Sequence, residues 1–483
     1  TGWCTAAGEN FAKSQLARGD FYVYYSLDNN GEAKIPRIAI RMDGKNKIGE
    51  IRGIADRQNM EPEMMTILEE KLKEFPDRDK YLKKEHDMKL LTLIDKKVNN
   101  NIELTLSELK FLYEINSKIE GFGYEKDPRI DEIKSKRNIK KDYALIFDVK
   151  KDEVALSQEE WEENPNKFKV LVSDLYLKTL INATGLVLPR HIIGYLELSW
   201  LISAEGLVLP QSIGGDLYLN GLTSAEGLVL PQNIGGDLYL YSLASAEGLV
   251  LPQNFSGSLY LSCLTSVECL VLPQSVGGDL CLNNLTSAKG LVLPQNIGGD
   301  LYLSNLTSAE GLVLPQNIGG NLYLSNLTSA EGLVLPQDFS GNLYLSNLTS
   351  AEGLVLPQDF SGDLYLSNLT SAKGLVLPQN IGGDLYLYSL ASAEGLVLPQ
   401  SVGGYLDIHN LDSAESLVLP QNIGGDLYLW SLTNTNGLVL PYGFDLDKLK
   451  CSSYIKNEIL QNPDNYFRKP PSEEENISIH HKR

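Results

Sequence analysis

One short motif recurs at a fixed step through more than half of the chain. The run Gly-Leu-Val-Leu-Pro begins at Gly185, and the equivalents of its proline follow every 21 residues from Pro189 to Pro441. These are thirteen copies with no insertion or deletion between them. A fixed period of this length indicates a solenoid, because one unit cannot bury its own apolar residues and must stack on the next.

The unit DLYLSNLTSAEGLVLPQNIGG is typical of the array. Leu301 and Leu303 flank Tyr302, and this alternation predicts a half-buried strand with leucine inward and tyrosine outward. Pro315 lacks an amide hydrogen and so ends a second strand or lies at a corner. Gly320 has a glycine at every equivalent place, which indicates a corner with positive φ or a close backbone approach.

The repeat resembles the short bacterial leucine-rich repeats, whose core reads LxxLxLxxNxLxxLP. The resemblance covers residues 171–446 and implies a parallel arc of coils. It departs at the turn, where Leu306 stands at the family's asparagine position and Asn305 comes one residue earlier. A two-sheet β-solenoid, with Ser308 and Gln316 ladders at its corners, is the alternative that stays open.

The part of the chain before the repeat differs in composition and predicts an α+β domain. Residues 21–26, 37–42 and 48–54 alternate apolar and polar residues around turn signals, which predicts a three-stranded antiparallel meander. Apolar spacing predicts helices over 64–75, 81–97 and 106–119, the last with a capping box at Thr105 and Glu108. A strand is expected over 142–149 and a short helix after Ser157.

These features divide the chain into four predicted parts. The fold class is an α+β N-terminal domain followed by a parallel β-solenoid of about 13 leucine-rich-type coils. The predicted boundaries are 1–125 for the α+β domain, 126–170 for a linker and capping segment, 171–446 for the solenoid, and 447–483 for a C-terminal cap and charged tail.

The beginning of the chain resembles the PcfJ-like proteins of conjugative plasmids and phages. The matching residues are Cys4, Arg52, Gly53, Gln58 and Asn59. The resemblance implies a domain type more than a mechanism. Cys4 is a weak candidate for a catalytic nucleophile, since such a thiol needs a nearby base and a structural cysteine is the favoured interpretation.

Tyrosines at the outward position of the repeat are the main candidate binding residues. Mutual stacking between neighbouring strands explains such a column, and a contact face is the functional alternative. The next outward position varies most between coils, and it supplies a possible hot spot of Tyr388, His409 and Trp430. The predicted face comprises Tyr218, Tyr239, Tyr260, Tyr302, Tyr323, Tyr344, Tyr365, Tyr386 and Tyr428 together with this cluster.

Charge limits the partners of the solenoid. Residues 171–441 hold 22 acidic and 4 basic side chains, a net −18 out of −20 for the whole chain. This field disfavours nucleic acid and favours a basic protein partner. Repulsion between the stacked carboxylates must be offset by solvent, salt, scattered lysines or cations. No metal site or cofactor is expected.

The sequence therefore predicts a non-enzymatic interaction protein whose acidic, tyrosine-faced solenoid binds a macromolecule, and a protein is the favoured partner. No apolar run is long enough for a membrane span, and a cytoplasmic location is expected. Two functional alternatives remain, beside a neutral interpretation in which the array is a recent expansion without a specific ligand. The N-terminal domain could hold an enzyme or mobile-element accessory activity with the solenoid as its targeting arm, or the chain could be a surface adhesin that binds glycans.

Overall fold

The computed structural model describes residues 19–28, 32–43, 47–53, 61, 64–75, 78–121 and 126–469. The chain divides into two compact units, residues 1–151 and 152–483. The first is a small α/β unit and the second is a parallel β-solenoid of about thirteen turns.

The first unit begins with the predicted meander. Strands β1 (Phe21–Leu27), β2 (Ala33–Asp43) and β3 (Lys47–Arg52) form an antiparallel sheet in chain order. Ile38 and Ile40 of β2 are fully buried against Leu68 and Leu72 of helix α3 (Met65–Leu72). The predicted meander and the first predicted helix are therefore confirmed.

The helices that follow are α4 (Arg78–Asn99), α5 (Leu106–Leu112), α6 (Arg129–Ser135) and α7 (Ile139–Phe147). The capping box of Thr105 and Glu108 opens α5 as predicted. The strand expected over 142–149 is wrong, because α7 occupies these residues. The Asn138 side chain caps α7 at its N-terminus. Asp142 of α7 is buried, and its carboxylate pairs with Arg137 at 2.6 Å and accepts a hydrogen bond from the Tyr113 hydroxyl.

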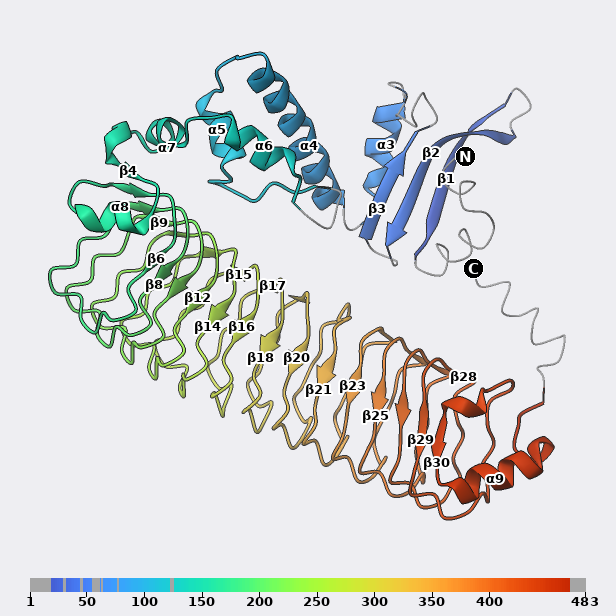
Figure 1. Ribbon diagram of the computed structural model, residues 1–483. Helices are drawn as coiled ribbons and strands as arrows, with labels where there is room; N and C mark the ends of the chain where they lie inside the picture. The colour runs from blue at the N-terminus through green and yellow to red at the C-terminus, as the bar shows by residue number, and fades with distance from the viewer. Residues whose placement is uncertain are drawn as a thin grey trace. The chain divides into compact units, whose positions relative to one another are not determined.

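The second unit is built on one continuous parallel sheet along which successive coils lie side by side (Figure 1). Each coil adds a short strand, and equivalent residues pair in register, as Leu301 does with Leu322. The fourteen strands are β6 (Leu175–Tyr176), β8 (Leu196–Glu197), β10 (Leu217–Tyr218), β12 (Leu238–Tyr239), β14 (Leu259–Tyr260), β16 (Leu280–Cys281), β18 (Leu301–Tyr302), β20 (Leu322–Tyr323), β21 (Leu343–Tyr344), β23 (Leu364–Tyr365), β25 (Leu385–Tyr386), β27 (Leu406–Asp407), β29 (Leu427–Leu429) and β30 (Leu449–Cys451).

A second face carries strands as well, but its sheet is interrupted. These strands lie two residues after the repeat proline, so Pro315 and its equivalents lie at a corner. The three segments are β4 (Val154–Ala155), β5 (Val170–Leu171), β7 (His191–Ile192), β9 (Ser212–Ile213) and β11 (Asn233–Ile234); β13 (Asn254–Phe255), β15 (Ser275–Val276), β17 (Asn296–Ile297) and β19 (Asn317–Ile318); and β22 (Asp359–Phe360), β24 (Asn380–Ile381), β26 (Ser401–Val402) and β28 (Asn422–Ile423).

Each interruption of the second sheet comes immediately before a coil with Ser in place of the first glycine of the GG pair. The serines are Ser256, Ser340 and Ser361, and the same coils carry Phe where the others carry Ile or Val. A Cβ at Gly319 would lie 2.3 Å from the carbonyl oxygen of Gly298 in the coil before. A side chain at this position therefore pushes regular coils apart. Ile193 also replaces this glycine, yet its strand β7 still pairs with the strand before it. That strand is β5, which belongs to the capping segment and not to a regular coil.

The interior and the corners follow from the repeat. Leu301, Leu303 and Leu306 are fully buried in the same core as their equivalents in neighbouring coils. Gly320 is required by close approach, since its Cβ would lie 2.7 Å from the Gly299 carbonyl carbon, whereas Gly311, with a φ of 77°, is the corner glycine with positive φ.

The asparagine column forms a ladder in spite of its shift by one residue from the leucine-rich frame. The Asn305 amide donates to Asn284 Oδ1 at 3.2 Å, and the same bond links the next coils up to Asn368. This ladder joins half-buried or exposed side-chain amides to one another, whereas the family's asparagine position is filled by the fully buried Leu306, so the departure from the leucine-rich frame remains. Ser308 instead accepts the backbone N–H of Glu310, two residues later in its own coil.

Both ends of the solenoid are covered, as Figure 1 shows within this unit. At the first coil, helix α8 (Gln158–Glu163) places Gln158 against the edge strand. The Gln158 side chain accepts from the Tyr176 backbone N–H at 2.8 Å and donates to its carbonyl at 3.1 Å, as a neighbouring strand would. At the last coil, helix α9 (Ser453–Gln461) buries Ile455 and Ile459. These caps protect the sheet edges from pairing with other chains.

Candidate functional site

The tyrosine column lies on the outer face of the fourteen-stranded sheet. In each regular coil, the leucine of the short strand is fully buried and the tyrosine after it is half-buried, as in Leu301 and Tyr302. The period-2 alternation of a strand accounts for this placement. The residues so placed are Tyr218, Tyr239, Tyr260, Tyr302, Tyr323, Tyr344, Tyr365, Tyr386 and Tyr428.

The rings stack on one another in two runs. Tyr218, Tyr239 and Tyr260 have ring centroids 4.5 and 4.7 Å apart and are parallel within 3°. From Tyr302 to Tyr386, four successive ring pairs lie 4.4 to 4.5 Å apart with angles of 5° to 17°. Cys281 takes the tyrosine position between the two runs and is buried. The stacking expected from the sequence is present, and it leaves the ring edges, more than the ring faces, open to a partner.

The aspartate before each strand links the tyrosine column to the backbone. Asp300 Oδ1 accepts the backbone N–H of Asn321 in the next coil at 2.6 Å, and its Oδ2 accepts the hydroxyl of Tyr302 at 3.0 Å. The same arrangement holds at Asp216, where burial and the carboxylate together raise the pKa of Tyr218 to about 12. These hydrogen bonds offset the repulsion between stacked carboxylates. The aspartate column therefore has a structural role, which the sequence reasoning missed.

The three hot-spot residues lie on one column at the C-terminal coils. The rings of Tyr388 and His409 are 5.2 Å apart, and Tyr388 also meets Tyr386 edge-on at 5.4 Å. Asp407, which replaces a tyrosine, holds His409 Nδ1 at 2.8 Å. Trp430 is 54% exposed on the next coil. The structure thus brings Tyr388 and His409 together and leaves the Trp430 ring largely open to solvent.

Other outward-facing aromatic residues on this unit, exposed or half-buried, were missed by the sequence reasoning. Tyr405 stands in the aspartate column, is 42% exposed and meets Tyr428 edge-on at 6.1 Å. Tyr195 stands in the same column and packs against Tyr176 and Tyr218. Trp200 is 65% exposed near the first coils. All three depart from the repeat consensus, and that departure at an outward position is the signal that could have found them.

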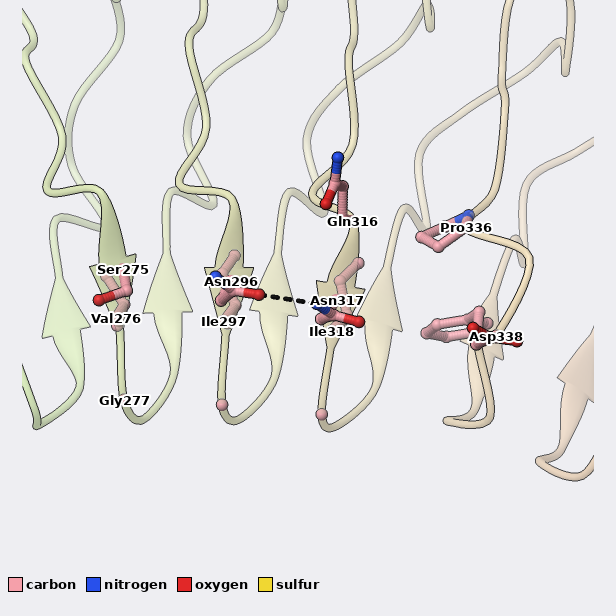
Figure 2. A pocket seen from close by; sticks show the side chains of 13 residues that line it. Ser275, Val276, Gly277, Asn296, Ile297, Gln316, Asn317, Ile318, Pro336 and Asp338 are labelled. Atoms are coloured by element: carbon pink, nitrogen blue, oxygen red, sulfur yellow. Dashed lines mark hydrogen bonds between the residues drawn. The ribbon is translucent and has the colours of Figure 1, made fainter. Parts of the chain in front are cut away.

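The second face holds a hollow beside one of the sheet interruptions. Its volume is about 460 Å³, and it lies where the coil of Pro336 and Asp338 leaves the ladder after β19. Figure 2 shows Asn296 and Asn317 side by side on adjacent strands, joined by an amide hydrogen bond of 2.7 Å. The lining offers three side-chain amides, the Ser275 hydroxyl and the Asp338 carboxylate, beside apolar side chains. It suits a hydrogen-bonding ligand and supplies no acid–base pair for catalysis.

The first unit gives little support to a catalytic site. Cys4, Gln58 and Asn59 lie outside the described residues, so the weak nucleophile candidate stays a prediction. Arg52 pairs with Glu50 on β3, and His86 is exposed on α4. Among the described residues there is no cluster of three or more His, Cys, Asp or Glu able to hold a metal ion. Within the same ranges, no helix is both long and apolar enough to cross a membrane.

Comparison with known proteins identifies no relative. No protein-family model matches the chain, and neither a curated protein nor a solved structure matches it. The resemblance of the first residues to PcfJ-like proteins therefore gains no support. The parallel stack of 21-residue coils is consistent with leucine-rich-type repeats, and a solenoid fold of this kind is typical of interaction scaffolds.

Proposed function

We propose that the solenoid is a non-enzymatic scaffold that binds a protein through the outer face of its fourteen-stranded sheet. The observation that carries this proposal is the run of aromatic side chains along that face. Tyrosine and tryptophan dominate the energetics of protein interfaces, since they bury a large area at a low cost in side-chain entropy.

The stacked tyrosines support binding because they are already ordered. Each ring is held by its neighbours at 4.4 to 4.7 Å, and several hydroxyls are held by the aspartate two residues earlier. A partner that contacts the ring edges does not have to immobilise free side chains, and this lowers the entropic cost of association.

The aromatic residues at the variable outward position of the repeat are the expected anchors. Tyr241 is 38% exposed and Trp430 is 54% exposed at the variable outward position, and Tyr388 shares that column. Variation at one column of an otherwise regular array allows different coils to recognise different parts of one partner.

The charge of the solenoid supports a partner with a basic rim. Residues 171–441 carry a net −18, so long-range attraction would accelerate the approach of a basic protein. An RNA or DNA partner is disfavoured by the same field.

The experiment is quantitative affinity capture with the full chain from a lysate of its source. The test variant replaces Tyr241, Tyr388 and Trp430 with Ser, and the control replaces Asn296 and Asn317 with Ser, the residue that the chain itself uses at equivalent positions such as Ser275. We expect a protein that the control recovers and the test variant loses. Equal recovery by both variants would remove the sheet face from the account, and retention on a glycan array instead would favour a carbohydrate ligand.

A further inference from the structure

A ridge of exposed valines runs along the solenoid on the stretch that follows the positive-φ glycine. One valine in each of eleven successive coils, from Val208 to Val418, is 65% to 78% exposed. The two leucines that flank Val313 are buried or half-buried, so the alternation of an extended segment turns the valine outward. Val334 and Val355 pair in parallel, so these two members of the ridge lie side by side on neighbouring coils.

Such a ridge needs an explanation because nothing inside the fold requires it. Each coil would keep its core with a polar residue at this position, since the valine contributes little buried area. A contiguous apolar stripe on the surface of a soluble repeat marks an interaction surface more often than it marks chance. We call it the valine ridge, and it is distinct from the tyrosine face.

An acidic column runs beside the valine ridge. Three residues before each valine stands a glutamate or, in two coils, a lysine, and these side chains are exposed. The glutamates differ from the aspartates of the sheet face, whose oxygens bond to the backbone and to tyrosine hydroxyls. Lys289 and Lys373 divide the column, and Lys373 pairs with Glu352 at 3.3 Å. The longest uninterrupted acidic stretch comprises Glu205, Glu226, Glu247 and Glu268.

From this arrangement we infer that the valine ridge is a docking surface for a basic amphipathic helix of another protein, seated first on the coils of Val208 to Val271. The ridge supplies the apolar contact, and the four glutamates beside it supply charge complementarity on one flank. A second copy of this chain is a poor occupant, because two such ridges would bring like-charged glutamate columns together.

The spacing of the coils selects a helix over an extended segment. Parallel strands lie about 4.8 Å apart, whereas a helix repeats its apolar face every 5.4 Å or so. The mismatch is about 0.6 Å per turn, so register holds for about four turns before it reaches half a coil. An extended chain repeats one face every ~6.7 Å and is out of register by more than half a coil at its third contact. A polyproline helix repeats after roughly 9.3 Å and would leave every second valine uncovered.

The test uses a synthetic helical peptide of about four turns, with leucine along one face and lysine along one flank. Its binding to the full chain is measured by fluorescence anisotropy. The controls are a peptide of the same composition in permuted order and a peptide in which glutamate replaces lysine. We expect the amphipathic peptide to bind, both controls to fail, and the affinity to fall as salt rises.

Variants of the chain locate the binding. The double change Val229→Ser and Val250→Ser is expected to weaken binding of the amphipathic peptide about tenfold, which is a loss of about 1.4 kcal/mol in binding free energy. Glu226→Gln with Glu247→Gln should reduce affinity and flatten its salt dependence. The matched control, Val376→Ser with Val397→Ser beside Lys373, should stay within about twofold of the parent.

Several results would overturn the inference. These are failure of the amphipathic peptide to bind, equal binding of the permuted peptide, and equal binding by the Val229→Ser, Val250→Ser variant. Analytical sedimentation of the chain without peptide, which measures its oligomeric state, gives a further result that would overturn the inference. If it is a dimer and this variant makes it a monomer, the valine ridge joins two copies instead. None of these outcomes bears on the tyrosine face, so the proposed function stands or falls separately.

Discussion

The aspartate that links neighbouring coils gives the sharpest test of the structural account. In Asp300→Ala, the backbone N–H of Asn321 loses the acceptor that now lies 2.6 Å away, and the Tyr302 hydroxyl loses its partner at 3.0 Å. The N–H is partly buried between two coils, so leaving it unsatisfied costs about 1–3 kcal/mol. The half-exposed Tyr302 hydroxyl can turn to water, and its loss adds little.

The chain itself provides the matched control for this change. Asn321 stands in the aspartate column, and its Oδ1 accepts the backbone N–H of Asn342 at 2.9 Å. Asp300→Asn therefore keeps the acceptor and removes only the charge, and we expect it to change the free energy of unfolding by less than about 0.5 kcal/mol.

The assay is denaturant unfolding followed by circular dichroism, together with hydrogen exchange at the Asn321 amide. Asp300→Ala should lower the unfolding midpoint and speed exchange at that amide, while Asp300→Asn should do neither. If the two variants lose the same stability, the carboxylate acts through its charge and the hydrogen-bond explanation is wrong.

Three further predictions concern the second sheet, the tyrosine hydroxyls and the core. Gly319→Ser should interrupt the second sheet and cost roughly 1–3 kcal/mol, because its Cβ would lie 2.3 Å from the Gly298 carbonyl oxygen. Unfolding measurements on Ile318→Phe would separate this effect from that of the larger core residue. Tyr218 has an ordinary pKa of 10 and a folded pKa of about 12, so the folded state holds its proton longer than the unfolded state. The contribution of Tyr218 to the free energy of unfolding should therefore be complete below pH 10 and be lost as the pH rises through about 12. A series of unfolding measurements in which the protein gains stability between these pH values would contradict this prediction. Leu345→Ala removes a fully buried side chain and should cost about 2–5 kcal/mol; a thermal melt within a degree or so of the parent would show that the coil repacks.

Much of the fold follows from periodicity in the sequence. The fixed step of 21 residues predicts the stack, and the alternation around Tyr302 predicts which side chains face outward. The capping box at Thr105 is local chemistry that needs no tertiary information. The segment around Asp142 was misjudged because a local signal was overlooked: the Asn138 side chain caps the helix that runs through these residues.

The candidate surfaces were less predictable for a different reason. The bond between Asp300 and the next coil joins residues 21 apart, so it depends on register between coils and leaves no local pattern. Val313 belongs to an apolar run, and only the structure shows that it faces outward while its neighbours are covered. The sheet interruptions likewise arise from a clash between coils.

The most direct test of the proposed function is site-specific photocrosslinking from the tyrosine face. A photoreactive phenylalanine analogue is placed at Tyr388 in one version of the full chain and at Asn317, on the second face, in another. The account predicts that a discrete protein from the source lysate is crosslinked from Tyr388 and not from Asn317. Crosslinking of the same protein from Asn317 alone, or from both positions equally, would contradict the claim that this solenoid binds through its fourteen-stranded sheet.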